Sequence, residues 1–503
     1  MKWPERNPKM DCHNELNYGS LLKKVMEYAP GSLLPALLGL LSAAVFTHIF
    51  AAFEYGRYSL ALSIAAFASV AAAAWLQTSL ARYLPSLQDQ GEINKLKECI
   101  AGGLALIVGA EAILAVIMAY GVYLFQPPGW QDLYLPTAGL IISSSLFTSL
   151  SVVLQAEMRA REYSRYNILT TGLKLLFSLT FVLLVAPKAE WIVYGAVAGT
   201  IILIPVMWRE TKLLPFGSLL QLKMDRPFWS GIKRLAAYGL PMIGWYLAVA
   251  LLGTGDRYVI QWFRGAAEVG IYSANYVLIT GAVGLLNAPV ILAAHPFLMK
   301  AGSEGDRRQT GRWLGNIIDW FIAAGILLTG FIWLFSGDFA QWFLGPQFRE
   351  GHVIMPVITA GYVAFQLSMY THKPLEFAGK THVMLIVAVL AVVVSAVLNI
   401  YLVPRMGYGA SAYAVLAGYL FYNIIVSYAG RKMVPWQVRW QLLAGITAIT
   451  ILGSIFIAYE RNSIQSQWGY AAGIIAAAIQ FLLLGGGIFY LFGFRKLFNV
   501  RPT

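Results

Sequence analysis

Long apolar runs follow one another through almost the whole chain, and they constrain its fold more than any other feature. A helix needs about 20 consecutive apolar residues to cross the hydrocarbon core of a bilayer, and such runs recur from Pro30 to Phe492. Hydrophobic residues make up 58% of the 503 residues and charged residues 12%, against about 25% charged in soluble proteins. The sequence therefore predicts a polytopic membrane protein.

The runs are continuous, whereas the strands of a membrane β-barrel alternate polar and apolar residues. Helices satisfy their own backbone hydrogen bonds in lipid, so we expect an all-α fold with about fourteen transmembrane helices. The expected spans are 28–52, 58–81, 99–125, 134–156, 166–186, 190–208, 235–263, 269–297, 314–335, 353–371, 383–403, 409–429, 441–459 and 469–492.

Basic residues predict the orientation, because cytoplasmic loops carry the excess of Lys and Arg. Of the 37 basic residues, seven fall on one side of the predicted membrane: Arg57, Lys188, Arg257, Arg264, Arg349, Arg405 and Arg461. Both termini lie on the opposite, predicted cytoplasmic side. The net charge of +13 is attributed to this topology and to anionic lipid, since nucleic acid has no basic domain to bind. The polar first 27 residues show no cleavable signal, and Cys12 and Cys99 receive no role.

Two short motifs recur at the same separation. "EYGRYS" at 54–59 returns as "EVGIYS" at 268–273, and "YGAVA" from Tyr194 returns as "YGASA" from Tyr408, each 214 residues later. This register predicts two copies of a six-helix unit, related by an axis along the membrane normal. The first motif, E-x-G-x-Y-S, is interpreted as a corner between helices, where Gly allows the turn. The predicted segments are a tail 1–27, the first repeat 28–208, a basic linker 209–234, the second repeat 235–430, and two further helices with a basic tail 431–503.

The loops are too short for a catalytic domain. The longest predicted connections are 209–234 on the inner side and 336–352 on the outer side. Nucleotide-binding G-x-x-x-x-G-K, zinc-binding H-E-x-x-H and redox C-x-x-C patterns are missing from the sequence. We therefore expect a transporter and not an enzyme.

Three stretches carry a family resemblance: "LLPALLGLLSAAVFTHIFAAFEYGRYSLAL", "YGLPMIGWYLAVALLGTGDRYVIQWFRGAAEVGIYSANY" and "EFAGKTHVMLIVAVLAVVVSAVLNIYLVPRMGYGASAYAVL". With them the chain resembles bacterial polysaccharide flippases, the Wzx-type O-antigen and exopolysaccharide exporters of the multidrug/oligosaccharidyl-lipid/polysaccharide superfamily. The resemblance implies alternating access that carries undecaprenyl-pyrophosphate-linked oligosaccharides to the outer leaflet of the bacterial inner membrane. Membrane lipids, a polymerase and glycosyltransferases are the implied partners. No cofactor is expected, and the coupling ion, Na⁺ or H⁺, stays open.

Such transport needs cations for the pyrophosphate and aromatic or polar groups for the sugars. Charged residues in predicted spans are therefore candidates, together with two aromatic residues deep in the seventh span. The candidate site residues are Arg257, Asp256, Lys174, Glu111, Arg82, Asp319, Trp245 and Tyr246.

Each candidate has an alternative interpretation. Glu111 and Lys174 are expected either to form an ion pair between the third and fifth helices or to serve substrate or protons. Arg82 and Asp319 are near enough to a membrane interface to reach water. Asp256 and Arg257 are adjacent, about 100° apart on a helix, and are predicted not to face the same neighbour. Arg257 is the leading candidate for the pyrophosphate, and a structural tether is its alternative.

Three other functions are weighed. A multidrug or organic-cation antiporter of the same superfamily is expected to carry an acidic residue deep in the first helix, and 31–53 contains none. A lipid II flippase is expected to place several Arg residues in its first, second and eighth helices, where this chain offers only Arg82. A membrane polysaccharide polymerase should carry a large outer loop.

His48 and His295 are interpreted as packing residues.

Overall fold

Helices dominate the part of the chain that the computed structural model describes, which comprises residues 18–87, 90–125, 130–213, 225–303 and 307–490. No strand occurs within these ranges. Thirteen helical segments there are long and apolar enough to cross a membrane. The eighth expected span lies within α11 (Ala266–Ser303), a helix of 38 residues. The predicted all-α, multi-pass fold is thus confirmed.

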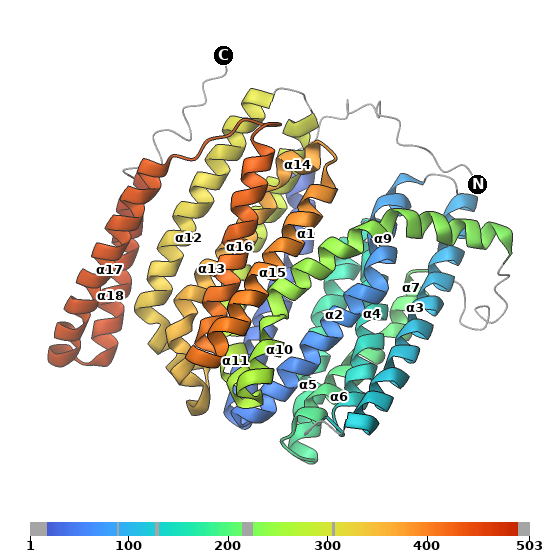
Figure 1. The fold of residues 1–503 in the computed structure, drawn as a ribbon, viewed down its shortest axis with the longest axis horizontal. Coiled ribbons are helices and arrows are strands. Elements are labelled where there is room, and N and C mark those ends of the chain that lie inside the picture. Colours follow the sequence, from blue (N-terminus) through green and yellow to red (C-terminus); the bar gives the residue numbers. More distant parts are fainter. Residues whose placement is uncertain (1–17, 88–89, 126–129, 214–224, 304–306, 491–503) are drawn as a thin grey trace. The chain divides into compact units, whose positions relative to one another are not determined.

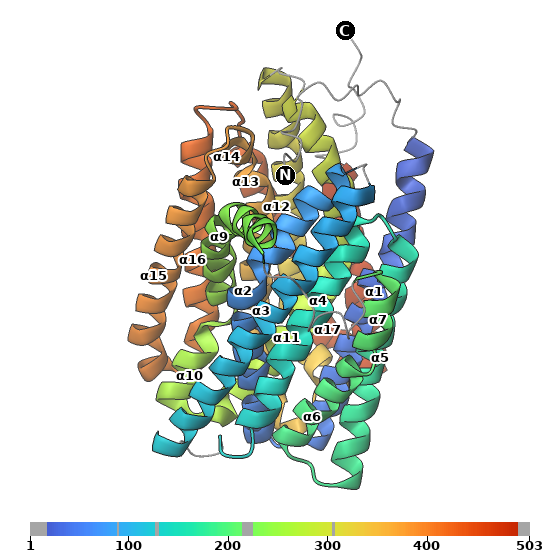
Figure 2. The same ribbon diagram turned by 90° about the vertical axis from the view of Figure 1, so that its right-hand side faces the viewer.

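The chain divides into two compact units, and the first runs from Met1 to Ala293. Figure 2 shows two of its helices, α5 and α6, side by side, and they are in close contact. Besides the part of α11 up to Ala293, the unit contains α1 (Tyr18–Ile49), α2 (Ala52–Tyr83), η1 (Leu84–Ser86), α3 (Gln90–Phe125), α4 (Tyr134–Ala156), α5 (Ala160–Leu184), α6 (Ala189–Ile201), α7 (Ile204–Glu210), α9 (Arg226–Thr254) and α10 (Asp256–Arg264).

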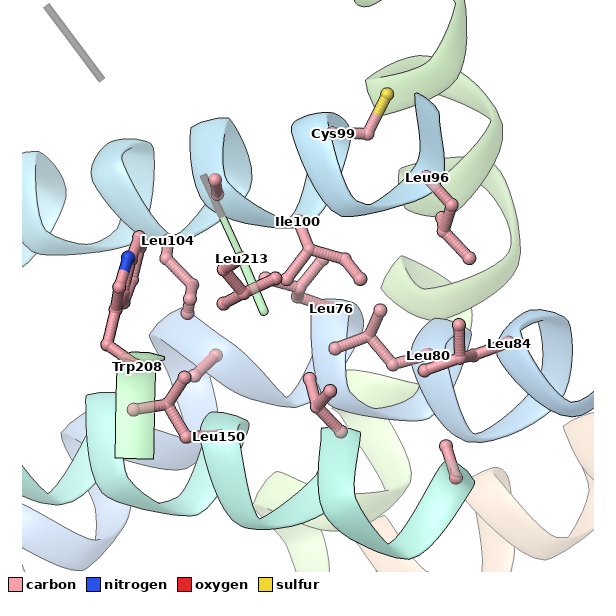
Figure 3. Packing of buried hydrophobic residues seen from close by; sticks show 14 of the residues in the cluster. Leu76, Leu80, Leu84, Leu96, Cys99, Ile100, Leu104, Leu150, Trp208 and Leu213 are labelled. Carbon is pink, nitrogen blue, oxygen red and sulfur yellow. The ribbon is translucent and has the colours of Figure 1, made fainter. Parts of the chain in front are cut away.

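The core of the first unit lies where α2, α3, α4, α7 and α9 converge. Figure 3 shows Leu76 and Leu80 of α2, Ile100 and Leu104 of α3, and Leu150 of α4 packed together. All five side chains are at most 1% exposed. Lipid tails are as apolar as leucine, so close van der Waals packing, and not escape from water, holds such helices together in a bilayer.

The second unit runs from Ala294 to Thr503. Figure 1 shows its last two helices, α17 and α18, side by side. α12 is tied to α17 near both ends: Arg439 Nε lies 2.6 Å from Asp319 Oδ2, and Arg461 Nη2 lies 2.6 Å from Asp338 Oδ1. The elements of the unit are α12 (Arg307–Phe343), η2 (Pro346–Ile354), α13 (Met355–Thr371), α14 (Lys373–Phe377), α15 (Thr381–Met406), α16 (Gly409–Gly430), α17 (Trp440–Trp468) and α18 (Tyr470–Phe489).

Several boundaries differ from the expected ones. α1 begins at Tyr18, so the end of the predicted tail is helical, while 1–17 lie outside the described residues. α9 begins at Arg226, inside the predicted linker, because Asp225 caps it by accepting a hydrogen bond from the Phe228 amide. The expected seventh helix is in fact two helices, α9 and α10, which meet at Gly255.

The two E-x-G-x-Y-S motifs contact one another. A Cβ on Gly56 would lie 1.8 Å from the Ala266 carbonyl oxygen, and a Cβ on Gly270 would lie 2.0 Å from the Ala52 carbonyl oxygen. The contact is therefore reciprocal, with both glycines in the first turns of α2 and α11. The predicted role of these glycines in a turn is wrong, because they lie inside the helices and let two backbones approach. The six-helix repeat itself stays a prediction.

Candidate functional site

Arg82 stands exposed at the end of α2, over the aromatic ring of a residue from another helix. Its guanidinium carbon lies 4.1 Å from the ring centroid of Tyr238 in α9 and 5.7 Å from that of Tyr83. The guanidinium carbon of Arg234, also in α9, lies 5.8 Å from the Tyr83 ring. Two cationic groups thus approach the Tyr83 ring, at the end of the unit that is predicted to be cytoplasmic.

The close packing of α2 on α9 positions these side chains. Ser79 Oγ donates a hydrogen bond of 2.6 Å to the Leu235 carbonyl. One turn further along α9, a Cβ on Gly239 would lie 2.0 Å from the Trp75 carbonyl oxygen, so only glycine permits this approach. The Tyr83 and Tyr238 rings consequently meet edge to face, with centroids 5.7 Å apart. Each contact of this kind contributes about 0.5–1.5 kcal/mol.

Arg82 has no carboxylate partner within ion-pair distance among the described residues. The tyrosine faces restrict the orientation of its guanidinium and contribute about 0.5–1 kcal/mol at an exposed position. Its donors remain directed to solvent, since the side chain is exposed. A planar guanidinium held in this way is suited to phosphate oxygens, which it contacts in pairs.

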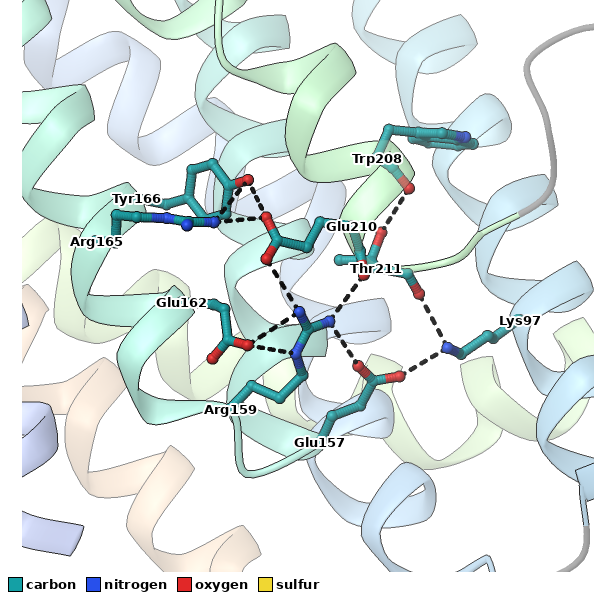
Figure 4. A network of polar contacts seen from close by, with 9 residues as sticks. All are labelled: Lys97, Glu157, Arg159, Glu162, Arg165, Tyr166, Trp208, Glu210 and Thr211. Carbon is teal, nitrogen blue, oxygen red and sulfur yellow. Dashed lines mark hydrogen bonds and ion pairs between the residues drawn. The ribbon is translucent and has the colours of Figure 1, made fainter.

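A second basic cluster of this unit is neutralised internally. Figure 4 shows Arg159 between Glu157, Glu162 and Glu210, with Lys97 against Glu157 and Arg165 against Glu210. Lys97 Nζ also donates to the Thr211 carbonyl at 2.9 Å. Three cations face three carboxylates, so the network joins the ends of α3, α5 and α7 and leaves little net charge for a ligand.

Trp245 and Tyr246 lie further along α9, with ring centroids 5.2 Å apart. Trp245 follows Tyr238 by seven residues, which places both on nearly the same face of the helix. Trp245 is half-buried, and Tyr246 is exposed. The two predicted aromatic candidates thus lie on the helix that carries Tyr238 and Arg234.

Asp256 and Arg257 both contact α11, so the prediction that they cannot face the same neighbour is wrong. The Tyr272 hydroxyl donates to Asp256 Oδ2, and Arg257 Nε donates to Ser273 Oγ at 3.1 Å. The reason is the break at Gly255, together with an Arg side chain long enough to turn back and donate to the Gly253 carbonyl. Arg257 is only 5% exposed, and its guanidinium also lies 4.8 Å from the Tyr276 ring.

The remaining charged candidates are separated. Glu111 accepts a hydrogen bond from Ser145 of α4, and within the described residues no ion pair joins it to Lys174. α4 contacts both α3 and α5, so the predicted direct pair between these two helices does not form. Asp319 belongs to the second unit, where it accepts hydrogen bonds from the Arg439 side chain and amide.

The sequence did not identify Tyr83, Arg234 and Tyr238 as site residues. The spacing of Arg234 and Tyr238, four residues apart at the start of an apolar run, was the available signal. Of the other residues considered, His48 bonds to the Ala44 carbonyl through Nδ1 at 2.8 Å, and Cys99 is buried and unpaired with another cysteine. Cys12 and the His295 side chain lie outside the part of the chain that is described.

Solved structures of transporters share this fold. The chain matches lipid II flippase MurJ in an inward closed conformation with a TM-score of 0.62 and 13% identity, over 92% of this chain and 99% of that one. It matches the eukaryotic MATE transporter AtDTX14 with a TM-score of 0.54 and 10% identity, over 86% and 99% of the two chains. A mutant of the Vibrio cholerae MATE transporter VcmN gives a TM-score of 0.51 and 13% identity, over 90% and 98%.

The sequence comparisons give the family. No curated protein matches the chain, but the family model described as "Polysaccharide biosynthesis protein" matches residues 21–301. This match covers more than half of the chain and, with the fold, confirms the resemblance found in the sequence. The chain therefore belongs to the polysaccharide biosynthesis protein family.

Proposed function

We propose that this protein carries a lipid-linked oligosaccharide, attached through undecaprenyl pyrophosphate, from the inner to the outer leaflet of the bacterial inner membrane. The family match supports the link to polysaccharides, and the fold likeness to transporters supports alternating access. The pyrophosphate carries the highest charge density of such a substrate. A protein that binds this pyrophosphate therefore needs accessible cationic side chains.

Arg82 is the residue that best fits the binding of the pyrophosphate. It is exposed, it has no carboxylate partner among the described residues, and the Tyr238 ring below it restricts its orientation. We assign the first contact with the pyrophosphate to Arg82, at the side of the membrane where the substrate is loaded. Arg234 approaches the neighbouring Tyr83 ring and adds positive charge next to Arg82. Phosphate oxygens held by guanidinium donors near apolar walls gain charge-assisted hydrogen bonds.

The aromatic face of α9 extends this site toward the membrane interior. Trp245 lies on nearly the same face as Tyr238, and the exposed Tyr246 ring touches it edge to face. Sugar rings present apolar C–H faces that pack on aromatic rings and hydroxyls that bond to polar tips. We assign the contacts with the oligosaccharide to these two residues.

Arg257 receives a different role in this proposal. Its donors are engaged by Ser273 and the Gly253 carbonyl, and the side chain is buried. A substrate would have to replace these contacts and reach a guanidinium that is 5% exposed. We therefore propose that Asp256 and Arg257 tether α10 to α11.

Binding of undecaprenyl pyrophosphate to the purified protein tests the site. We expect Arg82→Ala to weaken binding about 10-fold to 100-fold, the loss of one or two charge-assisted hydrogen bonds, while the melting temperature falls only slightly, because the lost contact with the tyrosine rings contributes about 0.5–1 kcal/mol. Arg209→Ala is the matched control, because Arg209 is an exposed basic residue of the same unit, and it should bind as the wild type does. Equal binding by the Arg82 variant and the wild type would refute the assignment.

A further inference from the structure

Glu111 is a buried carboxylic side chain in a membrane-spanning helix, and only one of its two carboxyl oxygens has a hydrogen-bond partner among the described residues. It lies in the span Gly91–Phe125 of α3 and is 2% exposed. Its Oε1 accepts a hydrogen bond from Ser145 Oγ of α4. Its Oε2 is buried and has no hydrogen-bond partner in the described part of the chain. Among the described residues, neither a cation nor a second donor compensates for the burial of this acid.

Within the described ranges, the elements packed around Glu111 do not supply a counter-charge. α3 packs against α4, α2 and α9. In α4 the ionisable side chain is Tyr134, eleven residues before Ser145; in α2 such side chains occupy 54–58 and 82–83 at the two ends, and in α9 they fall at 226, 233–234, 238 and 246. In α3 itself they occupy 92–99, 120 and 123. None of these groups forms an ion pair or a hydrogen bond with Glu111 among the described residues.

The neighbouring surface of α4 is polar along one stripe. Ser145 and Ser149 are four residues apart and both are fully buried. Ser149 receives a hydrogen bond of 3.2 Å from Gln77 of α2, and Ser69 of α2 donates to the Ile141 carbonyl at 3.3 Å. Glu111 therefore belongs to a seam of polar contacts between α2, α3 and α4, and within this seam it is the titratable member.

An ionised carboxylate without a counter-charge costs several kcal/mol in such surroundings, whereas the neutral acid avoids most of this penalty. The hydrogen-bond pattern fits the neutral form, with Oε1 as the carbonyl oxygen that accepts from Ser145 and Oε2 as the oxygen that carries the proton. From this geometry we infer that Glu111 is a proton-binding site, loaded in this conformation and emptied when the contact between α3 and α4 admits water.

Binding forms one O–H bond at Oε2 with a proton taken from water, and release returns that proton to water. Loading on one side of the membrane and release on the other would make one proton per cycle the energy source for transport. The inference deepens the proposed function by naming its coupling ion, and so it rests on that function. Its first test does not require any substrate.

Infrared spectroscopy of the purified protein detects the proton directly. Ordinary glutamates have a pKa of about 4.3 and are ionised at neutral pH, so a carboxylic C=O band that persists at neutral pH marks an exceptional acid. We expect this band in the wild type, its absence in Glu111→Gln, and its presence in Glu98→Gln. Glu98 is the matched control, because it is exposed on the same helix. Absence of the band in the wild type, or its persistence in Glu111→Gln, would overturn the inference.

Ser145→Ala keeps the acid in place, so it remains informative even where Glu111→Gln misfolds. Without the hydroxyl donor, the C=O band of Glu111 should move to higher frequency, as expected for a carbonyl that loses its hydrogen bond. An unshifted band would mean that the protonated acid is another residue, which overturns the assignment to Glu111.

Coupling is tested in proteoliposomes that hold undecaprenyl-pyrophosphate oligosaccharide, with and without a pH gradient. If one proton moves per cycle, a pH gradient of one unit should enrich the oligosaccharide lipid about tenfold in one leaflet over the other. We expect this enrichment in the wild type and in Glu98→Gln. Glu111→Gln should exchange substrate at equilibrium and show no accumulation. Gradient-driven accumulation by Glu111→Gln would contradict the inference, whereas absence of substrate movement in the wild type would contradict the proposed function and leave the infrared result standing.

Discussion

Ser59 Oγ donates a hydrogen bond of 2.7 Å to Ser273 Oγ, and the two serines are 214 residues apart. The two E-x-G-x-Y-S motifs are separated by the same 214 residues, so the bond joins the last serine of one motif to the last serine of the other. Gly56 and Gly270, three residues earlier in each motif, bring the same two helices into backbone contact. The two occurrences of the motif therefore pack on each other, and each supplies the same small residues.

This contact predicts a large effect of a single methyl group. Gly56→Ala would place Cβ 1.8 Å from the Ala266 carbonyl oxygen, which forces α2 and α11 apart and removes the serine bond. We expect a loss of about 1–3 kcal/mol, as for an overpacked core, visible as a lower melting temperature of the purified protein. Gly109→Ala is the control, because nothing lies within 4 Å of its Cβ and alanine favours helix by about 1 kcal/mol. Equal melting temperatures of the two variants would contradict the contact.

If Asp256 and Arg257 tether α10 to α11, removing Arg257 should lower the stability of the protein without weakening its binding of undecaprenyl pyrophosphate. Arg257 Nη1 lies 3.7 Å from Asp256 Oδ1, and both residues are buried. Arg257→Ala therefore leaves Asp256 buried without its cation, which costs about 3–5 kcal/mol for a buried pair. Arg264→Ala removes a partly exposed pair with Glu268 and should cost at most about 1 kcal/mol. Melting temperatures and retention of undecaprenyl pyrophosphate are measured side by side. If a folded Arg257→Ala protein no longer retained undecaprenyl pyrophosphate, Arg257 would be a substrate-binding residue and the tether proposal would be contradicted.

In the second unit, α17 should separate from α12 when one of its two ion pairs is broken. Asp338→Asn removes the carboxylate that accepts from Arg461 Nη2 and from the Tyr470 hydroxyl. We expect destabilisation of about 3 kcal/mol and faster proteolysis between α17 and α18. Glu350→Gln, an exposed acid of η2, is the control. Unchanged proteolysis in Asp338→Asn would show that this ion pair is not needed to hold α17 against α12.

The distribution of basic residues predicts the orientation, and reporter fusions measure it. A phosphatase that is active only outside the cytoplasm should work when fused after Gly469, between α17 and α18, and should be inactive after Arg308, at the start of α12. The positive-inside bias is the physical reason. Activity after Arg308 would invert the assigned topology, and with it the side on which Arg82 meets the substrate.

The sequence was sufficient to predict that the chain consists of membrane-spanning helices, because lipid imposes both their length and their apolar character, but it did not predict the break at Gly255 between α9 and α10. It was insufficient for side-chain partners. The 214-residue register predicts related helices, but it does not say that Gly56 faces Gly270. Likewise, Arg82 was recognised as a charge at the end of a span, whereas its orienting ring, Tyr238, comes from a helix about 150 residues later that only the fold brings near. Glu111 was expected either to pair with Lys174 or to serve substrate or protons, and the sequence did not indicate that Ser145 of α4 is its hydrogen-bond donor.

Transbilayer movement of a lipid-linked oligosaccharide tests the central claim most directly. Proteoliposomes containing the purified protein and undecaprenyl-pyrophosphate oligosaccharide in both leaflets are exposed to an external glycosidase. The proposed function predicts that the wild type exposes nearly all of the oligosaccharide to the enzyme, that Arg209→Ala does the same, and that Arg82→Ala is slower by about tenfold or more, as for one lost charge-assisted contact. Cleavage that stops at the outer half in wild-type vesicles, together with uptake of a lipophilic organic cation by the same vesicles, would contradict the flippase and establish the antiporter instead.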